Sequence, residues 1–362
     1  MPDITINYCA DIVQGTLDLL ESTGLKNLVR PDMKVSVKPN LVIAAPAERG
    51  ATTHSGVVEG IIRYLRDLGV SEITIIEGAS VDENATKKAF RVCGYDALSK
   101  KYDVPLYDLK NDATVTVNTA KHAFKVCRKA LETDFLINVP VLKAHCQTKF
   151  TCNLKNLKGC IPDSEKRRFH TIGLHSPIAW LSKAIPTHFC VVDGICGDLS
   201  FELGGTPVTR NTLLAGADPL LLDSYGAGLI GYRTDEIEYL RIAADIGVGR
   251  LFDGHTRVLE LNADKKPPQP RADSSEIRKL ARYINEDGAC SACYAALICA
   301  LRQTKPPLTT KIDIGQHFRG KPGVAGCGNC NSLHDRFVPG CPPKAVDIAA
   351  FISSLQSGFS QN

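Results

Sequence analysis

The chain has 362 residues, 44% of them hydrophobic, which is enough for one large and one small folded domain. A net charge of +4 and an aromatic content of 6% argue against a nucleic-acid binder, which usually concentrates basic and stacking side chains on one face. The first residues contain no basic segment followed by an apolar run, and no stretch is apolar for a membrane-spanning length. We therefore expect a cytoplasmic protein that contacts neither nucleic acid nor membrane.

Short β-branched strands alternate with amphipathic helices along the first two thirds of the chain. Strands are expected at 35–38, 73–76, 134–139 and 189–193, and helices at 55–68, 218–230 and 234–246. Ser55 and Thr234 are suitable N-caps for two of these helices, and Gly69 is a suitable stop. The alternation predicts an α/β fold with a mixed or mostly parallel sheet flanked by helices.

A stiff, polar segment at 265–270 contains three prolines and is expected to be a linker. It separates a predicted α/β core domain at 1–264 from a predicted cysteine-rich module at 271–362. This small C-terminal module is expected to end in a short helix.

Fourteen cysteines require an explanation other than disulfides in a protein expected in the reducing cytosol. Six of them fall between residues 290 and 341, where two CxxC pairs and a Cys-Pro end are typical of cluster motifs. We expect one 4Fe-4S cluster, with ligands Cys290, Cys293, Cys330 and Cys341. Cys327 is the expected substitute ligand, and Cys299, in an apolar run, is expected to be a buried helix residue.

The main alternative for the cysteine module is a structural zinc site. Cys290-x2-Cys293 and Cys327-x2-Cys330 would supply four thiolates, as in a zinc ribbon. The 33 residues between the pairs are longer than the usual ribbon loop, and Cys341 would have no role. The spacing therefore favours the iron–sulfur cluster.

A second group of polar residues follows the predicted strands of the core domain, where α/β sheets place their sites. The candidates for acid–base chemistry are Lys143, His145, Lys155 and Asp193. The candidates for binding an anion in a basic cleft are Lys38, Asn40, His54, Asn156, Lys158 and His170. The alternative is that the lysines are solvated surface charges and the histidines are structural.

These residues resemble the prokaryotic domain-of-unknown-function family 362 (DUF362) over about residues 1–260. The matching pieces are Lys38-Pro-Asn40, residues 55–78, Asp134-Phe-Leu-Ile-Asn-Val-Pro140 with Lys143 and His145, Lys155-Asn-Leu-Lys-Gly159, His170, Asp193-Gly194, and Asp218-Pro219 with Asp223. The resemblance implies an α/β fold, a link to anaerobic redox metabolism and, often, ferredoxin-like cysteine motifs. The two-cluster pattern Cys-x2-Cys-x2-Cys-x3-Cys-Pro is missing, which favours one cluster. Residues 57–78 are also similar to the amino-terminal domain of nickel-pincer lactate racemases.

We therefore expect an iron–sulfur protein that acts in electron transfer or as an oxidoreductase. Its partner would be an anionic small molecule or a redox partner protein, and the sequence allows a homodimer. One alternative is a non-redox racemase or lyase acting on a small carboxylate, with Lys143, His145 or Lys155 as acid–base groups and a structural metal. The other is a cluster-carrying assembly factor without turnover of its own.

Overall fold

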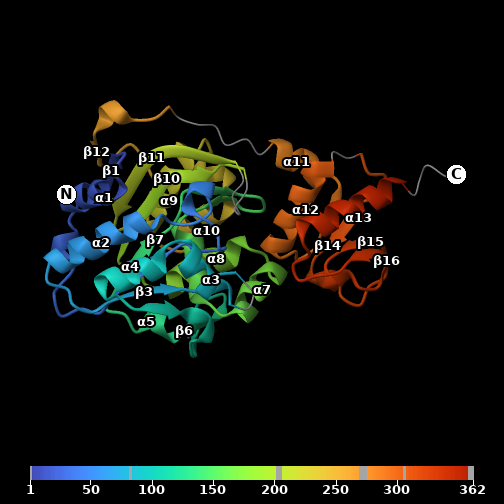
Figure 1. The fold of residues 1–362 in the computed structure, drawn as a ribbon, viewed down its shortest axis with the longest axis horizontal. Coiled ribbons are helices and arrows are strands. Elements are labelled where there is room, and N and C mark those ends of the chain that lie inside the picture. Colours follow the sequence, from blue (N-terminus) through green and yellow to red (C-terminus); the bar gives the residue numbers. More distant parts are fainter. Residues whose placement is uncertain (1, 81–83, 201–205, 269–274, 305–306, 358–362) are drawn as a thin grey trace. The chain divides into compact units, whose positions relative to one another are not determined.

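The computed structural model describes residues 1–362 except 1, 81–83, 201–205, 269–274, 305–306 and 358–362 (Figure 1). Contacts divide the chain into two compact units. The first unit comprises Met1–Lys166 and His175–Ala272, and the second comprises Arg167–Leu174 and Asp273–Asn362. None of the described helices is both long and apolar enough to cross a membrane.

An eight-stranded sheet forms the centre of the first unit, in the order β12-β1-β11-β10-β7-β2-β3-β4. Its strands are β1 (Ile4–Tyr8), β2 (Val35–Pro39), β3 (Ile73–Glu77), β4 (Leu106–Asp108), β7 (Phe135–Val139), β10 (Phe189–Asp198), β11 (Pro207–Gly216) and β12 (Val258–Leu261). All neighbours pair in parallel except β11, which is antiparallel to both β1 and β10. Two hairpins stand apart from this sheet: β5 (Thr114–Asn118) with β6 (Ala123–Cys127), and β8 (Lys143–His145) with β9 (Lys149–Thr151).

Helices connect these strands, which confirms the predicted α/β fold. They are α1 (Ile12–Glu21), α2 (Ser55–Asp67), α3 (Ala85–Val92), α4 (Tyr95–Tyr102), α5 (Arg128–Leu131), α6 (Asn153–Asn156), α7 (Asp163–Thr171), α8 (His175–Ala184), α9 (Pro219–Leu229) and α10 (Glu238–Asp245). Short 3-10 turns are η1 (Leu25–Asn27), η2 (Ala47–Arg49), η3 (Leu109–Asn111), η4 (Leu157–Cys160), η5 (Thr234–Glu236) and η6 (Ala263–Lys265). In α2, Val57, Ile61 and Leu65 recur every fourth residue and are fully buried, which fixes this helix on the apolar core.

Two predicted helix starts are corrected by the structure. His54, and not Ser55, is the N-cap of α2, and Ser55 is its first helical residue. The helix predicted from Thr234 is divided into η5 and α10, because Ile237 is fully buried in an extended conformation between them. Burial of this isoleucine therefore overrides the local helical pattern.

The second unit contains a four-stranded, fully parallel sheet in the order β13 (Ile284–Glu286), β14 (Ile312–Ile314), β15 (Gly323–Cys327) and β16 (His334–Val338). Its other elements are α11 (Ser275–Ala281), α12 (Ser291–Thr304), α13 (Ala345–Ser357), η7 (Gln316–Phe318) and η8 (Asn329–Asn331). Helices α12 and α13 pack against each other. Because neighbouring strands are parallel, the segments that follow them meet at one edge of the sheet.

Candidate functional site

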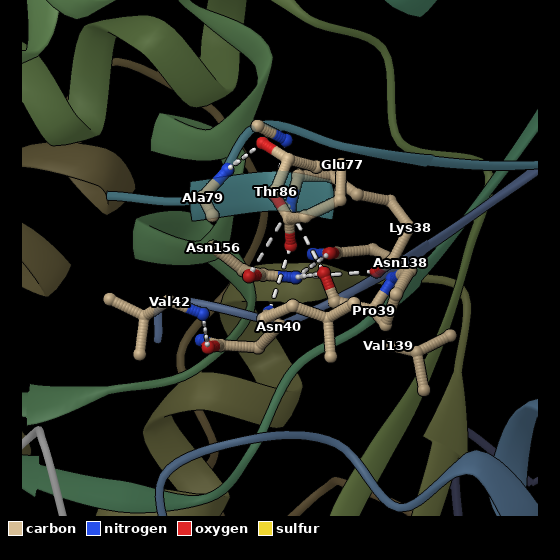
Figure 2. A network of polar contacts seen from close by, with 12 residues as sticks. Lys38, Pro39, Asn40, Val42, Glu77, Ala79, Thr86, Asn138, Val139 and Asn156 are labelled. Atoms are coloured by element: carbon tan, nitrogen blue, oxygen red, sulfur yellow. Dashed lines mark hydrogen bonds and ion pairs between the residues drawn. The ribbon is translucent and has the colours of Figure 1, made fainter. Parts of the chain in front are cut away.

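A buried ion pair joins the carboxyl ends of β2 and β3 (Figure 2). The Nζ of Lys38 lies 3.1 Å from each carboxylate oxygen of Glu77 and 3.4 Å from Oδ1 of Asn156, and it also donates to a backbone carbonyl. The Glu77 carboxylate accepts two further hydrogen bonds, from the backbone N–H groups of Leu41 (3.0 Å) and Gly78 (2.7 Å). Each charge is thus compensated inside the protein, as a buried charge requires.

Gly159, the last residue of the Lys-Asn-Leu-Lys-Gly motif, packs directly against this ion pair. The ion pair leaves no room for a side chain at this position. A Cβ atom at position 159 would lie 2.2 Å from Oε1 of Glu77 and 2.6 Å from Nζ of Lys38. A Cβ atom on Gly78 would in turn lie 2.6 Å from the carbonyl oxygen of Gly159. Two glycines are therefore needed for backbone and ion pair to come this close.

A chain of buried side-chain amides continues from the ion pair toward α9. The Nδ2 of Asn156 donates to Oδ1 of Asn138 (2.8 Å), and the Nδ2 of Asn138 donates to the carbonyl of Asn153 (3.0 Å). Asn153 donates to Oδ1 of Asp223 through its backbone N–H (2.7 Å) and its Nδ2 (2.9 Å), and the N–H of Leu154 donates to Oδ2 (3.0 Å). Burial raises the pKa of Asp223 to about 7, although the hydrogen bonds from Leu154 and Asn153 lower it.

His54 and Asp193 form a second buried pair, between the N-terminus of α2 and β10. Oδ2 of Asp193 accepts the backbone N–H of His54 at 2.7 Å and lies 2.9 Å from its Nδ1, while Oδ1 accepts the N–H of Ile195 at 3.0 Å. Burial acts to lower the pKa of His54, but the hydrogen bond and negative charge of Asp193 outweigh it, so this pKa lies above its ordinary value of 6.5. The fold therefore favours the imidazolium form of His54.

This pair predicts a specific dependence of stability on pH. The folded state raises the pKa of His54, so protonated His54 stabilises the fold. This contribution to the free energy of unfolding is fully present below pH 6.5 and is lost as the pH rises through the folded pKa. In the wild type, the free energy of unfolding should therefore decrease above pH 6.5, by at most about 1.4 kcal/mol per pH unit. The His54→Gln variant should not show this decrease. Urea unfolding of both proteins between pH 5 and 9 measures the difference. If the two proteins gave parallel curves of unfolding free energy against pH, His54 would have the same pKa in the folded and unfolded states.

The other acid–base candidates are buried and already make hydrogen bonds. Nζ of Lys143 donates to the carbonyl of Ala51 at 2.6 Å, and Nζ of Lys155 lies 3.5 Å from Oγ1 of Thr151. Nδ1 of His145 accepts two backbone N–H groups, so a neutral His145 carries its proton on Nε2. Burial excludes the alternative that Lys143 is a solvated surface charge, since it is 1% exposed. A catalytic role for these three residues stays a prediction.

The remaining anion-binding candidates are Asn40, Lys158 and His170. Oδ1 of Asn40 accepts the backbone N–H of Val42 at 3.4 Å, beside the Lys38 network (Figure 2). Lys158 lies on η4 of the first unit. His170 lies in Arg167–Leu174, which belongs to the second unit. The binding of an anion by these six residues stays a prediction.

Sequence reasoning assigned no role to Glu77 or Lys166. Lys166 is buried and donates to the carbonyls of Gly78 (3.0 Å) and Ala79 (2.7 Å) and to Asp163 (3.2 Å), and burial lowers its pKa. The signal for Glu77 was its place directly after the strand at 73–76, where a carboxylate can reach a neighbouring strand end. Nothing in the local sequence indicated Lys166.

Five cysteines line one cavity in the second unit: Cys290, Cys293, Cys327, Cys330 and Cys341. The first two follow β13, the third ends β15, the fourth lies in η8, and the last follows β16. The parallel sheet thus brings to one edge thiols that are up to about fifty residues apart in sequence. Cys299 lies on α12 and is only partly buried, whereas a buried position was predicted.

Two side-chain N–H donors point at these sulfur atoms. Nε of Arg319 lies 3.4 Å from Sγ of Cys330, and Nε2 of Gln316 lies 3.6 Å from Sγ of Cys290. Burial raises the pKa of Cys293 well above its ordinary value, and the charges of the four other cavity cysteines raise it further. Across the part of the chain that the structure describes, no three or more His, Cys, Asp or Glu side chains are arranged to hold a single metal ion. The ligand set Cys290, Cys293, Cys330 and Cys341 therefore stays a prediction.

An α/β core with buried polar side chains at its strand ends, joined to a cysteine-rich unit, defines the class of this protein. The chain belongs to the family described as "Domain of unknown function (DUF362)", whose model matches residues 35–228. This range contains the network from Lys38 to Asp223 and ends before the cysteine cavity. The resemblance inferred from the sequence is thus confirmed at the level of the family.

The chain is 26% identical over 207 residues to the "Thylakoid-associated protein sll1697" of Synechocystis sp.. The match covers 55% of this chain and 64% of that protein, which is less than two thirds of its length. Two solved structures are similar to parts of the chain. The lactate racemase apoprotein from Thermoanaerobacterium thermosaccharolyticum has 16% sequence identity and a TM-score of 0.41. The match covers 60% of this chain and 54% of the racemase chain. A protein from Thermotoga maritima has 15% sequence identity and a TM-score of 0.35, and the match covers 50% of this chain and 49% of that protein.

Proposed function

We propose that the second unit holds one 4Fe-4S cluster and that the protein acts in electron transfer, as an electron carrier or an oxidoreductase. The observation that carries this proposal is the convergence of five cysteine thiols on one cavity. A cluster of this kind needs four thiolates around one centre. Cys290, Cys293, Cys330 and Cys341 are the proposed ligands, and Cys327 is the substitute.

The surroundings of the thiols suit such a group. Gly315, Gly328 and Gly340 line the cavity, and all three have positive φ angles that favour glycine. A Cβ atom on Gly328 would lie 3.9 Å from Sγ of Cys293, so the backbone passes close to this sulfur. N–H groups that donate to ligand sulfurs are among the features that set the potential of an iron–sulfur site. When bound, the cluster would supply the capacity to accept or release one electron.

Arg319 is proposed to favour the reduced state of this site. Its guanidinium donates to the Cys330 sulfur, and the neighbouring Cys341 and Cys290 also interact with its charge. A positive charge beside the sulfurs stabilises added negative charge, although its exposed position allows water and salt to screen the effect. The proposal does not require a basic cleft around Lys38, since the ammonium group of Lys38 is bonded to Glu77.

The test is an absorption spectrum of protein purified without oxygen, with iron, zinc and acid-labile sulfide measured on the same sample. We expect a broad band near ~400 nm that bleaches with dithionite, and about four irons and four sulfides per chain. A colourless protein with about one zinc per chain would contradict the proposal. The cysteine unit would then be structural, and the non-redox alternative would remain for the first unit.

A further inference from the structure

A cavity of about 750 Å³ lies in the first unit, away from the Lys38–Glu77 pair. Its lining comes from the end of β1, the first half of β11, the helices α9 and α10, the turn η5 with Asp235, the loop before β12 and the two residues after η6. The strands β12, β1 and β11 form one end of the sheet order, whereas β2 and β3 lie toward the other. The volume falls in the range of small-molecule sites, about 300–1,000 Å³.

Arg210, on β11, contributes a buried positive charge to this cavity. The residue is 6% exposed, and its Nη1 donates to the carbonyl of Leu229 at 2.8 Å. Its Nε is buried without a hydrogen-bond partner, and no acidic side chain among the described residues forms an ion pair with it. A buried charge without a counter-charge is costly, and an anionic ligand would offset this cost.

The free edge of the guanidinium indicates which anion fits. In arginine, Nε and Nη2 lie on one edge and present parallel N–H groups, a spacing that matches the two oxygens of a carboxylate. Since Nη1 is engaged with Leu229, this edge is the part of Arg210 that remains for a ligand. Arg241 also lines the cavity and adds a second positive charge.

Aromatic side chains form the apolar wall of the same cavity. Tyr225 and Phe252 meet edge to face with ring centroids 4.9 Å apart, and Tyr8 lies near Arg210 at the end of β1. Phe252 is 43% exposed, which is unusual for so large an apolar side chain. A ligand that packs against these rings would bury this surface.

We propose that this cavity binds a small organic acid whose carboxylate pairs with Arg210 and whose aromatic body packs against Tyr225 and Phe252. The site involves the first unit alone, so a test of this proposal does not depend on whether the second unit holds an iron–sulfur cluster.

Titration calorimetry on the full chain tests this proposal with benzoate, acetate, benzamide and phenyl phosphate as probes. Benzoate should bind saturably and more tightly than acetate, while the neutral benzamide should not bind. Arg210→Met should weaken benzoate binding about 10- to 100-fold, the value of a lost charged hydrogen-bonded contact. Arg63→Met, an exposed change on α2, is the matched control and should leave the affinity unaltered.

Thermal unfolding of the ligand-free proteins separates binding from a structural role. Arg210→Met removes an unpaired buried charge, so it should raise the melting temperature while it weakens benzoate binding. A lower melting temperature with unchanged benzoate affinity would overturn the proposal. Absence of saturable benzoate binding would also overturn it, and so would tighter binding of phenyl phosphate, which would assign the site to phosphates.

A second variant keeps the test valid if Arg210→Met does not fold. Phe252 is exposed at the cavity wall, so Phe252→Ala should fold. It should reduce the preference for benzoate over acetate about 2- to 10-fold, the value of an aromatic contact. An unchanged preference would show that the ring does not pack against the probe and would contradict the proposed orientation.

Discussion

Replacing Lys38 by methionine is expected to lower the free energy of unfolding by about 3–5 kcal/mol, the usual cost of removing one partner from a buried ion pair. The pair is almost completely buried, with side chains 0% and 3% exposed. Methionine fills much of the volume of lysine but leaves the buried Glu77 carboxylate without its counter-charge. Urea unfolding of the variant and the wild type measures the loss.

The control is a salt bridge of the same residue types at the surface. Lys101 pairs with Glu59 at 2.7 Å, but the lysine side chain is 61% exposed, so Lys101→Met should change stability little. The double variant Lys38→Met/Glu77→Gln should regain much of the lost stability, because it removes both charges and keeps a side-chain oxygen that can accept a backbone N–H. If Lys38→Met were as mild as the control, or if the double variant were no more stable than the single one, the ion pair would not be the cause.

The same pair shows how far sequence could lead. Lys38 was identified because it ends an apolar strand, and strand ends are where α/β proteins place polar groups. Its partner depends on β2 and β3 being adjacent and in register, with Val37 opposite Ile75, and this order is a property of the whole sheet. Local patterns therefore located Lys38 but not its bond to Glu77.

Burial was a second property that residue types alone did not settle. Lysines in a polar run are usually solvated, yet Lys38 and Lys143 are at most 1% exposed. Arg210 was not singled out, because β11 carries no motif and no strand was predicted there. The strands at 35–39, 73–77 and 135–139 were found because apolar β-branched runs signal buried parallel strands directly.

The largest effect on function is expected at the cysteine cavity. Changing Cys290, Cys293, Cys330 or Cys341 singly to serine should remove the visible band and lower the iron content from about four per chain toward zero. Loss of one thiolate leaves the cluster with an incomplete set of protein ligands, and metal binding is coupled to folding of the site. Iron, sulfide and absorbance are measured on each variant after reconstitution without oxygen.

Two further serine variants distinguish cysteines that bind the proposed cluster from cysteines that only lie near it. Cys299 lies on α12 outside the set of cavity cysteines, so Cys299→Ser should keep the full cluster. Cys327 lines the cavity and is 1% exposed, but the four proposed ligands complete the cluster without it. Cys327→Ser should therefore also keep about four irons per chain. Loss of iron in Cys327→Ser, with retention in Cys330→Ser, would exchange these two residues in the ligand set, because both reach the same cavity from one short turn.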